Sequence, residues 1–142
     1  MQTFLPYADF AESAAVLDYR RLGKQRVEVL QLFNALTGKS KGWANHPAAI
    51  MWRGYEPALA AYGNACIYEW VSRGYNNTMP YWAVGKLYEL PWWLGDYDFH
   101  LSHMSNLLRK DPAWYSKWFT DVPDNLPYVW PARLTATRIA AS

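Results

Sequence analysis

The sequence predicts an all-α fold, and three observations support this prediction. Apolar residues recur at helical spacing, capping residues, glycines and prolines divide these stretches, and no strand-like alternation or internal repeat is present. At 142 residues the chain is long enough for one domain with a proper core and too short for two ordinary ones. We therefore expect one compact helical domain over residues 1–131 and a loose C-terminal tail over residues 132–142.

The first two helices are predicted by acidic caps. Asp9, with Glu12 three residues later, resembles a capping box that opens a short helix. Asp18 is placed to cap the next helix, in which apolar residues keep helical spacing over 19–36. Gly38 then provides the stop signal.

Prolines mark the starts of the next two helices. The sequence Asn45-His46-Pro47 is typical of a cap followed by proline in the first turn, and predicts a short helix that ends near Gly54. Glu56-Pro57 opens a longer helix, for which Gly74 is the predicted terminator.

The second half of the chain is less regular. Asparagines, glycines, prolines and aromatics over 75–95 break both periodicities, so we expect an aromatic-rich loop over the helices. A helix should start near Asp96 or Asp98 and end at Lys110. After Asp111-Pro112 we expect a short aromatic helix over 113–119, followed by an extended segment over 126–131.

Composition indicates a folded protein of the cytosol. Hydrophobic residues make up 51% of the chain and charged residues 18%, which argues against disorder. The single cysteine, Cys66, lies in an apolar run and fits a buried, reduced thiol. There is no signal-peptide pattern and no apolar run of about 18 residues, the length that a membrane span needs.

Cations cluster in residues 18–28, although the whole chain carries a net charge of only +2. At 100° per residue, Arg20, Lys24 and Glu28 share one stripe of the predicted helix, and the adjoining stripe holds Arg21, Gln25 and Glu28. An ordinary exposed face with a Lys24–Glu28 ion pair is one interpretation. The other is a phosphate-binding surface on which Glu28 or Asp18 polarises a reacting group.

The histidines allow several interpretations. His100 and His103 lie three residues apart on a predicted helix and are spaced to ligate a metal. A third ligand would have to come from His46, Asp96 or Glu69. Alternatively, His103 contacts a phosphate or base beside Asn106 and Lys110, or it has a structural role. His46 precedes a proline, where neutral imidazole caps a helix.

Aromatic residues account for 18% of the chain, more than a core of this size needs. Those at helical spacing among aliphatics are predicted core residues: Phe33, Trp52, Tyr62 and Trp70. Those in the loop and C-terminal segments are candidates for stacking on bases: Trp82, Trp92, Trp93, Trp114, Tyr115, Trp118, Tyr128 and Trp130.

These residues resemble the pyrimidine-dimer DNA glycosylases of the phage endonuclease V type. The similarity is carried, in the same order along the chain, by Asp18-Tyr19-Arg20-Arg21-Leu22, Ser72-Arg73-Gly74-Tyr75 and Asp111-Pro112-Ala113-Trp114-Tyr115-Ser116-Lys117. A bacterial and phage branch of that family is still more similar. That similarity is carried by residues 21–27, 45–48, 103–110 and 126–131.

The resemblance implies a helical DNA repair enzyme without metal or other cofactor. An amine attacks the sugar C1′, forms an imine, and cleaves the backbone by β-elimination. Met1 supplies the α-amine, because a residue as bulky as Gln2 normally leaves the initiator methionine in place. Lys24 is the alternative nucleophile if burial and neighbouring cations depress its pKa. Arg21 stands at the position of the family's carboxylate, so that role would fall to Glu28 or Asp18.

We therefore expect a DNA glycosylase with AP lyase activity on damaged or modified bases of double-stranded DNA. The alternatives are a non-catalytic nucleic-acid-binding module and a histidine-based, metal-dependent hydrolase. A cytoplasmic, nucleoid-associated monomer is expected. The predicted DNA and phosphate contacts are Arg20, Arg21, Arg26, His46, His103, Asn106 and Lys110.

Overall fold

The computed structural model describes residues 1–131, which contain six helices and no strand. The helices are α1 (Phe10–Val16), α2 (Tyr19–Leu36), α3 (Pro47–Trp52), α4 (Glu56–Ser72), α5 (Tyr97–Lys110) and α6 (Pro112–Tyr115). The all-α prediction is confirmed. The predicted tail, 132–142, lies outside the described residues.

The helix starts follow the capping residues found in the sequence. The side chains of Asp9, Asp18 and Asp96 accept hydrogen bonds from backbone N–H groups in the first turns of α1, α2 and α5. His46 caps α3 in the same way, with Nδ1 accepting from the N–H of Ala48 at 3.0 Å. Each bond satisfies a donor that the helix itself leaves free.

The aromatic helix after Asp111 is shorter than the sequence suggests. Instead of covering 113–119, α6 ends at Tyr115, and the chain then turns. Phe119 is buried and stacks on Tyr115, with ring centroids 5.7 Å apart and planes 3° apart. Burying Phe119 against Tyr115 draws the chain inward at this point.

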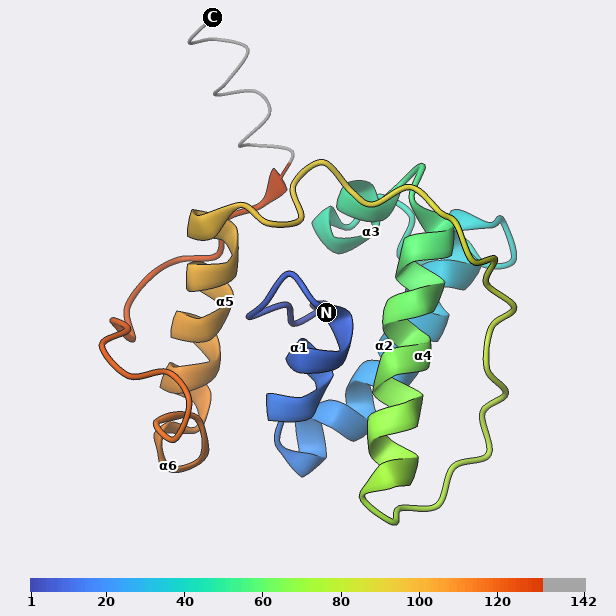
Figure 1. Ribbon diagram of the computed structural model, residues 1–142. Coiled ribbons are helices and arrows are strands. Elements are labelled where there is room, and N and C mark those ends of the chain that lie inside the picture. The colour runs from blue at the N-terminus through green and yellow to red at the C-terminus, as the bar shows by residue number, and fades with distance from the viewer. Residues whose placement is uncertain (132–142) are drawn as a thin grey trace, which may run out of the picture.

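Two long helices form the centre of the molecule. Helices α2 and α4 pack side by side, α1 packs against α4, and α5 with α6 stands on the other side of the N-terminal segment (Figure 1). The predicted loop over 75–95 follows the outer side of α4, and Trp82 packs closely against Gly63, where a Cβ would lie 2.5 Å from the indole ring. Cys66 is buried in this core, and burial raises the pKa of its thiol to about 12.

Residues 2–5 form an extended segment through the interior, held by side chains of the surrounding helices. The Phe4 carbonyl accepts from the Tyr62 hydroxyl at 2.6 Å. The Leu5 N–H donates to His103 Nδ1 at 3.0 Å, and the Leu5 carbonyl accepts from His100 Nδ1 at 2.7 Å. Because the backbone polar groups of a buried segment need partners, these bonds fix the position of the N-terminus.

Candidate active site

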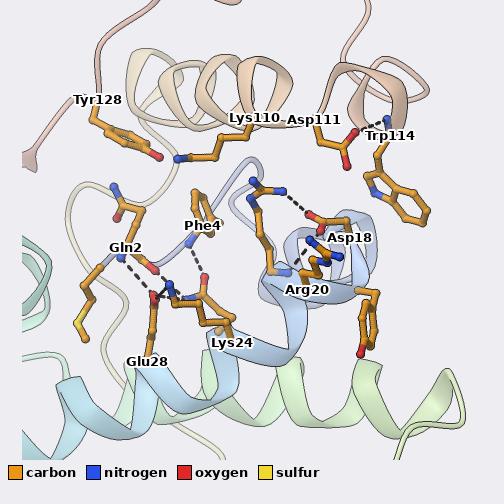
Figure 2. A pocket seen from close by; sticks show the side chains of 14 residues that line it. Gln2, Phe4, Asp18, Arg20, Lys24, Glu28, Lys110, Asp111, Trp114 and Tyr128 are labelled. Atoms are coloured by element: carbon orange, nitrogen blue, oxygen red, sulfur yellow. Dashed lines mark hydrogen bonds and ion pairs between the residues drawn. The ribbon is translucent and has the colours of Figure 1, made fainter.

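A pocket of about 740 Å³ opens between the N-terminal segment, the first turns of α2, and the α5–α6 junction (Figure 2). It brings together many of the predicted site residues: Met1, Arg20, Arg21, Lys24, Glu28, Lys110, Trp114 and Tyr128. The pocket volume is in the range of small-molecule and cofactor sites. The basic segment of the sequence therefore lines a cavity rather than only an exposed helix face.

Glu28 lies where the N-terminal segment meets α2. Its Oε2 accepts from the backbone N–H of Gln2 at 3.3 Å and from Gln25 Nε2 at 3.4 Å. Its Oε1 lies 3.6 Å from Lys24 Nζ, which confirms the predicted ion pair. The Glu28 side chain is 11% exposed, whereas that of Lys24 is 77% exposed. Lys24 thus lacks the burial that its use as an activated amine requires.

Gln25 connects α2 to the N-terminal segment. Its Nε2 donates to the Gln2 carbonyl at 2.7 Å, and its Oε1 accepts from the Phe4 N–H at 2.7 Å and the Tyr62 hydroxyl at 2.9 Å. Gln25 is 1% exposed and its amide is fully used. It therefore holds the first residues of the chain beside Glu28.

Cations outnumber carboxylates around the pocket. Arg21 pairs with Asp18 at 3.1 Å, whereas within residues 1–131 neither Arg20 nor Lys110 pairs with a carboxylate. Burial alone would raise the pKa of Asp18, but hydrogen bonds from Tyr115 and Arg21 outweigh it and lower the pKa. Asp18 stays ionised and tied to these partners, which leaves Glu28 as the carboxylate next to the N-terminus.

Tyr128 forms part of the wall opposite α2. Its segment is held on α5 by side chains: Ser105 Oγ accepts from the Leu126 N–H at 3.0 Å, and Asn106 Nδ2 donates to the Leu126 carbonyl at 3.0 Å. Burial raises the pKa of Tyr128 to about 12, so its hydroxyl remains protonated at neutral pH. Tyr128 therefore presents a ring and a hydrogen-bond donor to the pocket.

Several predicted DNA contacts have structural positions instead. His103 and Asn106 are buried in α5, with their side chains turned to Leu5 and to Leu126. Arg26 stacks on Trp70, with 4.3 Å from guanidinium carbon to ring centroid, and donates to Asn77 at 2.5 Å. These three residues do not line the pocket, because their side chains pack against other parts of the fold.

His46 lies close to the site without lining it. Burial lowers its pKa, as does the positive charge of the N-terminus, while Glu28 opposes the shift. The cap to Ala48 also needs an unprotonated Nδ1. His46 is accordingly a neutral cap of α3, close enough to the N-terminal amine to feel its charge.

The histidines of α5 are not arranged as a metal site. His100 uses both ring nitrogens, Nδ1 for the Leu5 carbonyl and Nε2 for the N–H of Gly95 at 2.8 Å. Across residues 1–131, no group of three or more His, Cys, Asp or Glu side chains is placed to hold a metal ion. Burial lowers the pKa of His103 to about 3, which makes it a neutral core residue.

The predicted stacking residues divide by burial. Trp93 and Tyr115 are fully buried and belong to the core, so the prediction that they stack on bases is wrong. Trp82 is half-buried against α4, where its carbonyl and N–H bond to Asn64. Trp114 and Tyr128 line the pocket. Trp92 and Trp130 lie outside it, with Trp92 exposed and Trp130 half-buried beside His46.

Other lining residues were not among the predicted site residues: Gln2, Phe4, Tyr19, Gln25 and Asp111. Helical spacing offered a signal for Gln25, which follows Arg21 by one turn. No pattern in the sequence places Gln2 or Phe4 there, because their position depends on side chains far along the chain. None of the described helices is long and apolar enough to cross a bilayer.

No curated protein and no solved structure matches the chain. Residues 1–83, however, match the family model described as pyrimidine dimer DNA glycosylase. The matched span contains the N-terminal segment, Lys24 and Glu28, and covers more than half of the chain. The chain therefore belongs to the pyrimidine dimer DNA glycosylase family.

Proposed function

We propose that this protein is a DNA glycosylase with AP lyase activity, acting on damaged or modified bases of duplex DNA through an imine on its own amine. The observation that carries the proposal is Glu28, held beside the N-terminus by the Gln2 N–H at 3.3 Å in a cation-rimmed pocket. A nucleophile, a carboxylate for proton transfer and phosphate-binding cations are the groups that this chemistry requires.

Met1 is the favoured nucleophile. An α-amine ordinarily has a pKa near 8, well below that of a lysine, so more of it is unprotonated at neutral pH. Lys24 is the second candidate, although it is exposed and paired with Glu28. We infer that bonds to residues 2–5 hold the amine in place while a flipped nucleotide enters the pocket.

In the proposed reaction, the amine nitrogen bonds to C1′ as the bond from C1′ to the base breaks. The proton lost by the nitrogen passes through Glu28 to the departing base. Opening of the sugar ring, in which solvent water gives a proton to O4′, produces an iminium. Glu28, again a carboxylate, accepts a C2′ proton as the 3′ phosphate leaves, and water hydrolyses the imine to restore the amine. Arg20 and Lys110 would hold the flanking phosphates.

Borohydride trapping on duplex DNA with an abasic site tests the lyase step. We expect a covalent adduct with chelator present, its retention in Lys24→Ala, and its loss when the α-amine is blocked. Intact mass will establish which residue carries that amine. Salt-sensitive DNA binding with neither adduct nor strand cleavage would overturn the lyase and leave a monofunctional glycosylase or a binding module.

Glu28→Gln tests the role of the carboxylate. We expect turnover to fall by about 100-fold or more while DNA binding persists, because general acid–base catalysis contributes about 10² to 10⁴ in rate. Glu12→Gln, on the exposed face of α1, is the matched control. A binding module predicts instead only a modest change, with Glu28→Gln tightening DNA binding by removing a negative charge.

A further inference from the structure

Two buried glutamines line the pocket, and they differ in how their amides are used. Gln25 bonds through both ends of its amide, to the N-terminal segment, Tyr62 and Glu28. Gln2 is 6% exposed, and its Nε2 has no hydrogen-bond partner within residues 1–131. A buried donor without a partner destabilises the fold unless something else uses it.

The orientation of the Gln2 amide follows from its neighbour. Its oxygen accepts from the N–H of Thr3 at 2.9 Å, and Thr3 is itself fully buried. Exchanging the amide oxygen and nitrogen would set two donors against each other, so the nitrogen must be the free end. Gln2 therefore offers N–H donors and no free acceptor at this end.

The Gln2 side chain points away from Glu28, toward the side of the pocket where Tyr128 and Lys110 lie (Figure 2). Its nitrogen is enclosed, so a ligand reaches it when a covering side chain moves. Tyr128 belongs to the extended segment after α6, whose backbone is held by side chains rather than by a helix or sheet. Tyr128 lies on this side of the pocket (Figure 2), and its position on a segment outside the helices lets it move without unfolding a helix.

We propose that Gln2 selects the flipped base, an inference that rests on the proposed function. The Gln2 Nε2 donates to the exocyclic oxygen at ring position 4 of a pyrimidine, where uracil carries a carbonyl and cytosine an amino group. A keto base is then favoured over the amino base of the same shape, whose N–H₂ group would face the donors of Gln2. Uracil and cytosine are the simplest such pair, since they differ at one exocyclic position.

Binding distinguishes this proposal from the catalytic one. Fluorescence anisotropy would compare otherwise identical duplexes that carry one unpaired deoxyuridine or one unpaired deoxycytidine. We expect the wild-type protein to bind the deoxyuridine duplex about tenfold more tightly, with Gln2→Met reducing the ratio to about one. Gln2→Glu, which keeps an acceptor for the Thr3 N–H, should shift the ratio toward deoxycytidine. Because both affinities are measured on the same variant, their ratio is insensitive to general effects of the substitution on folding and charge.

Gln31→Met, an identical change on the exposed part of α2, is the control and should keep the wild-type ratio. Met and Glu are as bulky as Gln, so neither substitution should change whether the initiator methionine is retained. A wild-type protein without preference, or a preference that survives Gln2→Met, would overturn the proposal. If the preference depends on Gln2 but neither excision nor an imine adduct is detected, the catalytic proposal fails and this one stands.

Discussion

Tyr115 illustrates how a predicted DNA contact becomes part of the core. Its hydroxyl donates a short hydrogen bond to the carboxylate of Asp18 and accepts from the Asp18 backbone N–H at 3.0 Å. Burial and the bond to Asp18 raise the pKa of Tyr115. The residue therefore ties α6 to the start of α2, close to the pocket but without exposed surface.

Tyr115→Phe should lower the free energy of unfolding by about 1–3 kcal/mol, because it removes the acceptor of the Asp18 backbone N–H and one donor to the Asp18 carboxylate. Urea unfolding measures this loss, and DNA affinity should stay unchanged. Tyr97→Phe, at an exposed position on α5, should alter neither quantity. Weaker DNA binding at unchanged stability would instead make Tyr115 a DNA contact.

Helix α2 contains a glycine where helix propensity alone favours alanine. A Cβ on Gly23 would lie 2.9 Å from two ring carbons of Trp70, which belongs to α4. Trp70 in turn stacks on Tyr19, with ring centroids 5.7 Å apart, and carries the guanidinium of Arg26. Gly23 therefore permits the close approach of α2 and α4 beside the pocket.

Gly23→Ala should destabilise the protein by about 1–3 kcal/mol through overpacking, despite a gain of about 1 kcal/mol in helix propensity. Gly42→Ala, where no heavy atom lies within 4 Å of the added Cβ, is the control. Urea unfolding of both variants measures the cost of an added Cβ against Trp70 and of one in open space. If Gly23→Ala is the more stable protein, Trp70 moves without cost and the packing argument fails.

Two neutral histidines, His100 and His103, join α5 to Leu5 of the N-terminal segment and so make the stability of the whole molecule depend on pH. Burial lowers the pKa of His100 and that of His103, the latter to about 3. The unfolded chain therefore takes up protons first as pH falls below about 6.5. Stability from these groups is fully present above that pH and is lost as pH falls toward the folded pKa values.

Between about pH 6 and pH 4 we expect His103 to lower the free energy of unfolding by about 1.4 kcal/mol per pH unit, and His100 to add to the fall until the pH reaches its own lowered pKa. Urea unfolding between about pH 7 and pH 4 measures this slope. His103→Asn keeps an acceptor for the Leu5 N–H and should flatten the profile. An unchanged slope in this variant would mean that other groups cause the acid sensitivity.

The charges of the pocket rim determine how salt affects DNA binding. Arg20 and Lys110 have no carboxylate partner within residues 1–131, so both are available to phosphates. Arg20→Ala and Lys110→Ala should each lower the slope of log K against log salt concentration by about 0.9. Lys86→Ala, an exposed cation outside the pocket, should leave the slope unchanged. A constant slope in the rim variants would argue against these phosphate contacts.

Local chemistry explains why the helix pattern was predictable. Asp9, Asp18, His46 and Asp96 cap helices through bonds to residues two or three positions away. The spacing of Lys24 and Glu28 likewise predicted their ion pair, since one helical turn separates them. The basic part of the candidate pocket was recognisable for the same reason.

The sequence by itself determined the helices, their caps and the basic face of α2, because each depends on neighbours within a turn or two. Only the tertiary structure decided that Gln2 and Glu28 meet, that His103 holds Leu5, and that Trp93 is core. These arrangements join residues up to 98 positions apart in the chain. A side chain's burial and bonding partners depend on which distant elements pack around it, and this information is absent from local patterns.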